Sequence, residues 1–228
     1  MSELLQKKDM QHESLEEEER RLGPDRSPVP DWLNVKKQLT FYASYHSHPI
    51  NIAIHMICIP IILWSTLLFL AHIPLGENAT ITRLAPWLSF QPNAALVMNA
   101  CYVAYYFALE PFGALTYLPH ALLSQLTVTY LATTPAAVHP FHLSSLRIAS
   151  YAQLFGWLSQ FAGHGFAEGR APALLDNLLQ ALVLAPFFSH LEYLFLAFKY
   201  NPKLQAEIKR GVQADKEARR LKKGKKAM

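Results

Sequence analysis

A histidine, a carboxylate and a guanidinium lie within seven residues of one another, at His164, Glu168 and Arg170. His164 and Glu168 are four residues apart, so both side chains project from one face if the segment is helical. Such a pair, completed by histidines from elsewhere in the chain, suits a non-haem Fe(II) or similar metal site. Gly163 and Gly165 would let another helix approach His164 closely. Arg170 could hold a carboxylate ligand through two parallel hydrogen bonds, or it could extend to a lipid phosphate.

Two further histidines could complete this site. His55 lies inside a long apolar segment, and His46 lies just before that segment. A separation of nine residues places two side chains on opposite faces of a continuous helix, so both could bind one metal only if Pro49 redirects the chain. Pro49 can begin a helix at its first position, and we therefore expect a turn just before it. Three other side chains are kept as reserve ligands or as residues that hold the ligands: His48, Asp176 and Glu192.

The same residues also have an explanation without chemistry. His164 would then bond a backbone carbonyl, and Glu168 would pair with Arg170 near a lipid headgroup. In this interpretation the protein is a non-enzymatic membrane scaffold or a small transporter, whose histidines serve only helix packing. A di-iron lipid hydroxylase or desaturase is a further alternative, but it needs an array of His-x-x-His or His-x-x-x-His boxes that the sequence does not contain.

Charge is distributed very unevenly along the chain. The segment from Phe41 to Phe198 contains only eight acidic or basic side chains, and no lysine occurs between Lys37 and Lys199. This pattern excludes an ordinary soluble globular protein and predicts an all-α, multi-spanning transmembrane helix bundle. The formal net charge of +4 conceals an acidic N-terminal tail and a strongly basic C-terminal tail. Beside membrane helices, a basic tail indicates contact with anionic headgroups, so we expect no nucleic-acid partner.

The elements that must position the candidate residues follow from hydropathy and from the prolines. Residues 31–45 have the spacing of an amphipathic helix at the membrane interface. Residues 94–134 are too long for one span and break near Glu110 and Pro111, which predicts two helices, or one span with a re-entrant piece. The other expected spans are 50–71, 147–166 and 172–198, with loops at 72–93 and 133–146.

This pattern divides the chain into a disordered acidic tail (1–30), an integral membrane catalytic domain (31–199) and a basic cytosolic tail (200–228). Lysines before the first span and after the last place both termini in the cytosol, so we expect about four crossings, with re-entrant or interfacial helices besides. The ending Lys225-Lys226-Ala227-Met228 resembles the di-lysine retrieval signal of endoplasmic-reticulum membrane proteins, and a generic basic tail would look the same. Cys58 and Cys101 lie in apolar segments and are expected to be free, buried thiols.

Two dense motifs connect the chain to a known family. They are Phe41-Tyr42-x-x-Tyr45-His46 with Pro49-x-Asn51-x-x-x-His55, and Gly156-Trp157-x-x-Gln160-Phe161-x-Gly163-His164-Gly165-x-x-Glu168. Over about residues 39–198 the chain resembles the fungal 2-hydroxy fatty acid dioxygenases. Those are endoplasmic-reticulum membrane proteins that convert phytosphingosine-derived 2-hydroxypalmitate to an odd-chain fatty acid.

The resemblance implies an Fe(II)-dependent α-oxidation in which O2 cleaves the bond between C1 and C2 of a 2-hydroxy fatty acid. It implies that His46, His55 and His164 bind the iron. Glu168 becomes a candidate fourth ligand, and Arg170 would steady the substrate carboxylate while the alkyl tail lies between helices. The implied partners are the 2-hydroxy fatty acid, O2 and the lipid bilayer. The implied location is the endoplasmic-reticulum membrane, and the oligomeric state stays open.

Overall fold

The computed structural model describes residues 29–169 and 180–226, and the described part is mostly helical. The expected disordered tail at residues 1–30 lies almost wholly outside this part. The chain up to Asn34 forms a unit of its own, whose described residues include a 3-10 helix at Asp31–Leu33. The elements that follow belong to a second unit, which begins at Val35. The amphipathic helix expected at 31–45 is therefore interrupted at Asn34.

Helix α2, Val35–Tyr45, ends shortly before helix α3, Pro49–Leu70, begins. Between them His48 is extended, and its Nδ1 accepts a backbone hydrogen bond of 3.3 Å from the first turn of α3. This cap, together with Pro49 at the first helical position, begins α3. The 22 residues of α3 reach about 33 Å at 1.5 Å per residue. The segment expected at 50–71 is thus confirmed as a helix long and apolar enough to cross a bilayer.

Helices α4, Ala94–Leu109, and α5, Pro111–Ala132, confirm the break that was expected near Glu110. Glu110 is extended, and its carboxylate accepts a hydrogen bond of 2.5 Å from the Gly113 amide. Pro111 follows at the first position of α5, where its missing N–H costs no hydrogen bond. A cap and a proline together therefore end one helix and begin the next.

A small sheet lies between α3 and α4. Strands β1, Thr82–Ala85, and β2, Leu88–Phe90, are antiparallel, with Thr82 paired with Phe90. Only a loop was expected at residues 72–93, so this hairpin is an addition to an otherwise helical described part. Strands of four and three residues are too short to show the alternation by which a strand is recognised.

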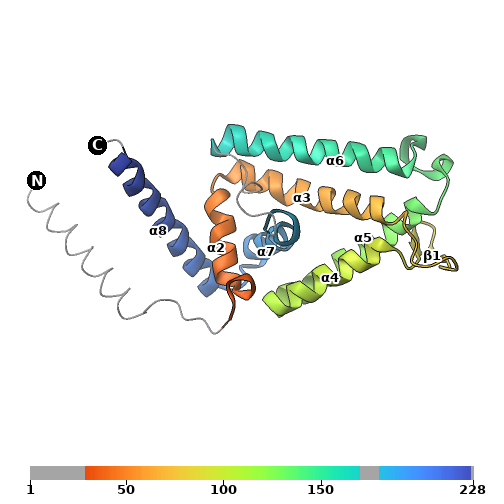
Figure 1. Ribbon diagram of the computed structural model, residues 1–228, viewed down its shortest axis with the longest axis horizontal. Coiled ribbons are helices and arrows are strands. Elements are labelled where there is room, and N and C mark those ends of the chain that lie inside the picture. The colour runs from red at the N-terminus through yellow and green to blue at the C-terminus, as the bar shows by residue number, and fades with distance from the viewer. Residues whose placement is uncertain (1–28, 170–179, 227–228) are drawn as a thin grey trace, which may run out of the picture. The chain divides into compact units, whose positions relative to one another are not determined.

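Helix α6, Ser145–Ala162, runs along α3, as Figure 1 shows. The close approach depends on glycine, because a Cβ placed at Gly156 would collide with Cγ1 of Ile62 on α3. Gln153 adds polar contacts across the same interface. Its Nε2 donates to the Ile62 carbonyl at 3.0 Å and to the Thr66 hydroxyl at 2.7 Å.

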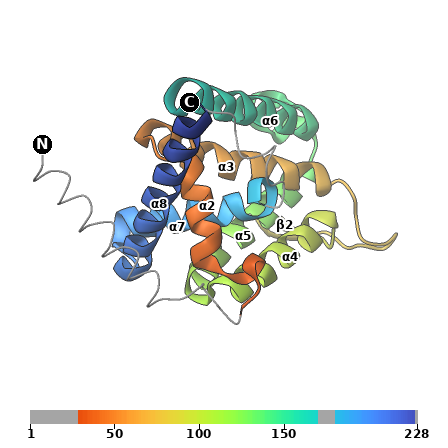
Figure 2. The same ribbon diagram turned by 60° about the vertical axis from the view of Figure 1, so that its left-hand side comes forward.

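Two π-helical segments lie on either side of residues 170–179, which the structure does not describe. They are η4, Gly163–Glu168, which continues α6, and η6, Gln180–Leu184, which leads into helix α7, Ala185–Phe198. Figure 2 shows α7 among α2, α3 and α5, and three of its side chains are fully buried: Phe187, Phe188 and Leu191. Residues 181–198 form a second stretch long and apolar enough to cross a bilayer, whereas residues 172–179 of the last expected span lie outside the described part.

Helix α8, Pro202–Lys226, occupies the segment that was expected only as a basic tail. It packs against α2, with Leu204 and Ile208 buried (Figure 2). Lys36 of α2 lies 3.5 Å from Glu207 of α8, so this lysine forms an ion pair with the neighbouring helix. Helix formation went unnoticed in the sequence because the segment is polar, with few apolar residues to reveal a helical period.

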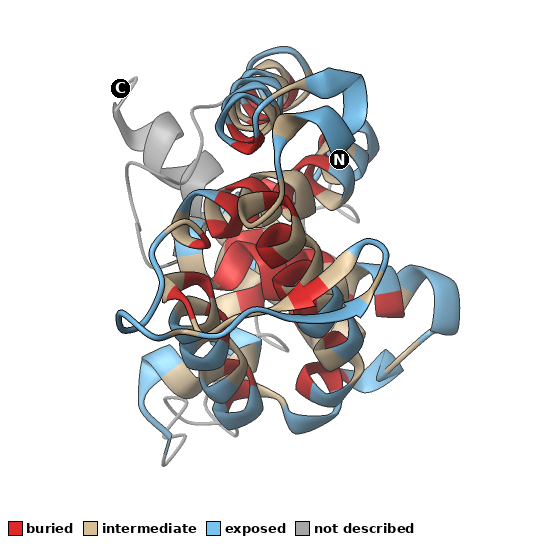
Figure 3. Cartoon of the chain, turned by 90° about the vertical axis from the view of Figure 1, so that its right-hand side faces the viewer, coloured by how far each residue is buried: buried red, intermediate tan, exposed pale blue. Residues whose placement is uncertain are grey.

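Buried residues gather on the sides of the helices that face one another, and exposed residues face outward (Figure 3). Both cysteines are free, as expected. Cys58 is buried, but Cys101 is exposed on the outer side of α4, so the expected burial holds only for Cys58.

Candidate metal centre

Two histidines that are close in the chain meet a third from much later in the sequence, inside the helical unit. His46 directly follows α2, His55 lies in the second turn of α3, and His164 lies in η4. All three are buried, and one nitrogen atom of each lies within 4.8 Å of the others. Their ring centroids are 4.3, 4.8 and 5.1 Å apart. The structure therefore brings together the three histidines that the sequence motifs indicated.

The turn between α2 and α3 removes the geometric objection to this group. His46 and His55 would lie on opposite faces of one continuous helix, but the chain leaves helical geometry at His48 and starts a new helix at Pro49. His55 can then face the preceding turn, where His46 lies.

Backbone carbonyls orient two of the three rings. Nδ1 of His46 lies 2.7 Å from the Tyr42 carbonyl, and Nδ1 of His55 lies 2.9 Å from the Asn51 carbonyl. A carbonyl only accepts, so each Nδ1 carries the proton and a neutral ring keeps its lone pair on Nε2. Metal-binding histidines are commonly held in this way, and neutral imidazoles suit Fe, Zn, Cu or Ni. The donors present therefore fit a transition-metal ion.

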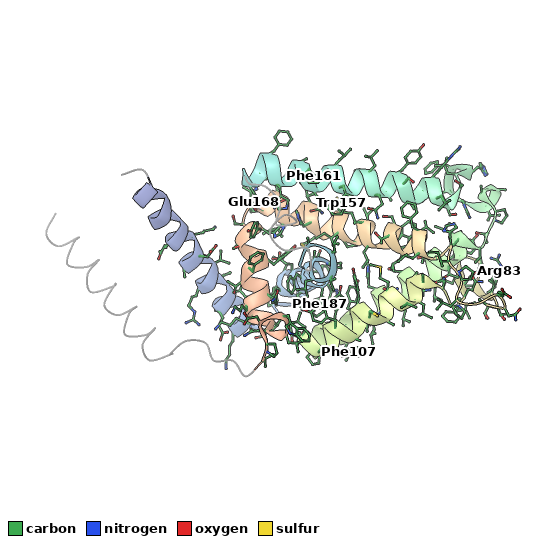
Figure 4. The ribbon with its side chains drawn as sticks, in the orientation of Figure 1. Arg83, Phe107, Trp157, Phe161, Glu168 and Phe187 are labelled. Carbon is green, nitrogen blue, oxygen red and sulfur yellow. The ribbon has the colours of Figure 1, made fainter. Side chains whose placement is uncertain are left out.

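Glu168 binds the turn between α2 and α3. Its Oε1 accepts hydrogen bonds from the backbone amides of Ser47 and His48, at 2.6 and 2.7 Å, and from Nδ2 of Asn51 at 3.3 Å. Its Oε2 accepts from the Ser47 hydroxyl at 3.0 Å. Figure 4 shows Glu168 beside the junction of the two helices. The carboxylate thus lies next to the histidine group without belonging to it.

The hydrogen bonds also determine the charge of Glu168. Partial burial alone would raise the pKa of its carboxyl group. The bonds from the His48 and Ser47 backbones, followed by those from the Ser47 and Asn51 side chains, outweigh burial and hold this pKa below its ordinary value. Glu168 is therefore ionised at neutral pH and presents a full negative charge to the amides of the turn.

The remaining candidates lie elsewhere. His48 caps α3 with its Nδ1 and is exposed, and Glu192 is half-buried on α7. Neither belongs to the histidine group. Arg170 and Asp176 lie outside the described residues, so their roles as substrate clamp and reserve ligand stay predictions.

An apolar cavity of about 210 Å³ begins at the histidines. The lining residues of α3 lie between His55 and Thr66. These two residues are eleven positions apart, which corresponds to about 16 Å along the helix. Trp157 and Phe161 of α6, labelled in Figure 4, belong to the same wall. The other lining residues are Tyr42, His46, Ile59, Ile62, Leu63, Met98, Tyr102, Gln160, His164, Ala181, Leu182, Ala185 and Pro186. Such a wall suits a long apolar ligand whose polar end meets the histidines.

Two residues that support the histidines received no role in the sequence analysis. The Tyr42 ring stacks on His46 with centroids 4.1 Å apart, in addition to its carbonyl contact. Asn51 is fully buried and contacts both His55 and Glu168. Each precedes its histidine by four residues, and this spacing could have identified both, since it places the carbonyl of one residue beside the side chain of the other.

Gly163 allows η4 to lie directly against α3. A Cβ there would lie 2.5 Å from Oδ1 of Asn51, which confirms the expected close approach. Gly165 shows no such approach among the described residues, because none of their atoms lies within 4 Å of a Cβ at that position.

Replacing Gly163 with alanine is expected to weaken both the fold and metal binding. The added methyl group would push Asn51, and with it His55, away from η4, and overpacking of this kind costs about 1–3 kcal/mol. Thermal unfolding in detergent and metal titration would measure the two effects. Gly165→Ala is the matched control and should change neither, so equal losses in the two variants would contradict the role given to Gly163.

The described residues thus form a helical bundle in which three histidines meet at the wall of an apolar cavity. This is the arrangement of a helical protein with a candidate metal centre and a cavity suited to an apolar ligand. The sequence model of a family described as 2-hydroxy-palmitic acid dioxygenase Mpo1-like matches residues 32–196. The chain belongs to this family, which confirms the resemblance seen in its two motifs.

A curated relative supports the same assignment. The chain is 33% identical to the 2-hydroxy-palmitic acid dioxygenase MPO1 of Saccharomyces cerevisiae over 183 residues, which cover 79% of this chain and 91% of the yeast protein. No solved structure shows significant similarity to the chain.

Proposed function

We propose that the protein is an Fe(II)-dependent dioxygenase that shortens 2-hydroxy fatty acids of the 2-hydroxypalmitate type by one carbon. The observation that carries this proposal is the meeting of three buried histidines at one end of an apolar cavity. The name of the yeast relative, a 2-hydroxy-palmitic acid dioxygenase, supports the substrate class. One 2-hydroxy acid and one O2 would give the shortened fatty acid, one CO2 and one water, so that atoms balance.

His46, His55 and His164 would hold the ion, with Glu168 as the residue that fixes the turn carrying His46. A ferrous ion bound there would supply the activation of O2 that cleavage between C1 and C2 requires. The described residues contribute by positioning the substrate. The apolar wall along α3 holds the alkyl chain and excludes water, and this places the carboxylate and the 2-hydroxyl group at the histidine end. Arg170 is the proposed partner of the carboxylate.

We also propose a multi-pass location in the endoplasmic-reticulum membrane, with about four crossings, both termini in the cytosol and a role in phytosphingosine breakdown. Two stretches, Pro49–Leu70 and Ala181–Phe198, are long and apolar enough to cross. Helix α6 supports a further crossing, because large apolar side chains are exposed on it: Tyr151, Leu154, Phe155 and Leu158. Its polar Gln153 instead faces α3. An exposed apolar face of this kind suits contact with lipid.

Removal of iron is expected to abolish product formation. Protein purified anaerobically in detergent and loaded with Fe(II) should convert 2-hydroxypalmitate to the acid one carbon shorter when O2 is admitted, as mass spectrometry would show. Treatment with a chelator should reduce the product to background, and added Fe(II) should restore it. Full turnover after chelation would refute the iron assignment. Absence of both transition metal and product would favour the non-enzymatic scaffold or transporter.

A further inference from the structure

One buried donor in the cavity wall has no hydrogen-bond partner in the part of the chain that the structure describes. Gln160 lies on α6, one turn before His164, and lines the same cavity. Its side chain is only 6% exposed, and its Nε2 atom is buried with no hydrogen-bond partner among the described residues. Buried donors are almost always paired in folded proteins, because an unpaired one loses its hydration without compensation. A donor kept in this state beside a cavity indicates that a ligand completes it.

Three other polar groups of the wall are already paired. The Thr66 hydroxyl donates to a carbonyl of its own helix at 2.8 Å, and the Tyr102 hydroxyl donates to the Leu182 carbonyl at 3.3 Å. The Trp157 indole donates to Oε1 of Gln153 at 2.9 Å. Unlike these three groups, Nε2 of Gln160 can bind a ligand without breaking a hydrogen bond to any described residue.

A carboxylate is the ligand group that this donor suits. An amide N–H needs an oxygen lone pair, and an ionised carboxylate is the strongest acceptor that a fatty acid offers. Within the described part of the cavity wall there is no lysine or arginine, so no described cation competes for the carboxylate.

We propose that Nε2 of Gln160 donates a hydrogen bond to the substrate carboxylate at the histidine end of the cavity. This inference rests on the proposed function. Gln160 and His164 are one turn apart on the continuous segment formed by α6 and η4, so a carboxylate held by Gln160 would keep C1 and C2 beside the histidines. The alkyl chain would then extend along α3. Gln160 is a substrate-binding residue in this role.

The test measures binding without turnover. Dissociation constants of 2-hydroxypalmitate and of palmitate are measured for the iron-loaded protein in the absence of O2. Gln160→Leu should weaken the binding of both acids by roughly tenfold to a hundredfold, as expected for a lost hydrogen bond to a charged group. Unchanged constants for both acids would overturn the inference. A loss confined to 2-hydroxypalmitate would also overturn it, because the donor would then serve the 2-hydroxyl group.

Gln125→Leu is the matched control, since Gln125 is similarly buried but is paired with Asn93 and Thr129 and does not line the cavity. It should lower the unfolding temperature and leave both dissociation constants close to those of the wild type. Gln160→Leu should show the reverse, with an unfolding temperature that is unchanged or higher when no ligand is present. An equal loss of stability in the two variants would make the Gln160 amide structural and overturn the inference.

Product formation under O2 separates this inference from the proposed function. If the wild type forms no shortened acid but Gln160→Leu still weakens palmitate binding, the proposed function fails and the inference holds. If the wild type forms the product and Gln160→Leu binds both acids as tightly as the wild type, the inference fails and the proposed function holds.

Discussion

Replacing His164 with alanine should remove both the metal and the activity. His164 comes from η4, whereas His46 and His55 lie close together in the chain, so its loss leaves two imidazoles on one side of the site. Loss of a residue that merely orients a metal ligand costs about 10–100-fold in metal affinity or activity, and loss of a ligand itself should cost at least about 100-fold. Metal analysis and product formation from 2-hydroxypalmitate would measure the two effects.

His142→Ala is the matched control for this variant. His142 is exposed in the connection between α5 and α6, and its Nδ1 contacts only a nearby carbonyl, that of Ala137, at 2.9 Å. Metal content and activity should both be retained. A His164→Ala protein that keeps stoichiometric iron and full turnover would exclude the three-histidine centre.

Replacing Glu168 with alanine should weaken metal binding by about 10–100-fold, through the turn that carries His46. The variant loses the acceptor of four hydrogen bonds and leaves the amides of Ser47 and His48 without their partner. Glu168→Gln should keep part of the affinity, because its amide oxygen can still accept from the backbone. Metal titration of the two variants would give the comparison.

The spectrum of the bound iron separates the two roles considered for Glu168. If the residue only holds the turn, the iron in fully loaded Glu168→Gln should have the wild-type spectrum. A changed spectrum at full occupancy would make the carboxylate a ligand. Glu207→Gln is the control, since its ion pair with Lys36 joins α8 to α2 and an exposed pair of this kind contributes little to stability.

The sequence predicted the histidine group through its motifs more than through its spacing. Spacing alone left His46 and His55 on opposite faces, and only the interruption at Pro49 reconciles them. The break at Glu110 was visible because a capping carboxylate and a proline are local signals. Helix α8 was missed because its segment is polar and contains few apolar residues that could reveal a helical period.

The role of Glu168 shows a different limit. Its spacing from His164 correctly placed both residues in one helical segment, but the partners of the carboxylate lie 121 residues earlier, in the turn at Ser47. The open amide of Gln160 depends likewise on what the neighbouring helices leave unpaired. Such facts follow from packing between distant segments, and one sequence without relatives contains no signal for them.

The bond between Ser47 and Glu168 also has a topological consequence. It joins the two ends of a long segment of chain that includes α3, the hairpin, α4, α5 and α6. His46 and His164 lie at nearly the same two ends, where their rings are in contact. A metal ion bound to all three histidines would act as a cross-link across this long loop, and links across long loops restrict the unfolded chain most. Metal binding and folding are then coupled, because the turn that carries His46 and the segment that carries His164 must meet before the ion can be held.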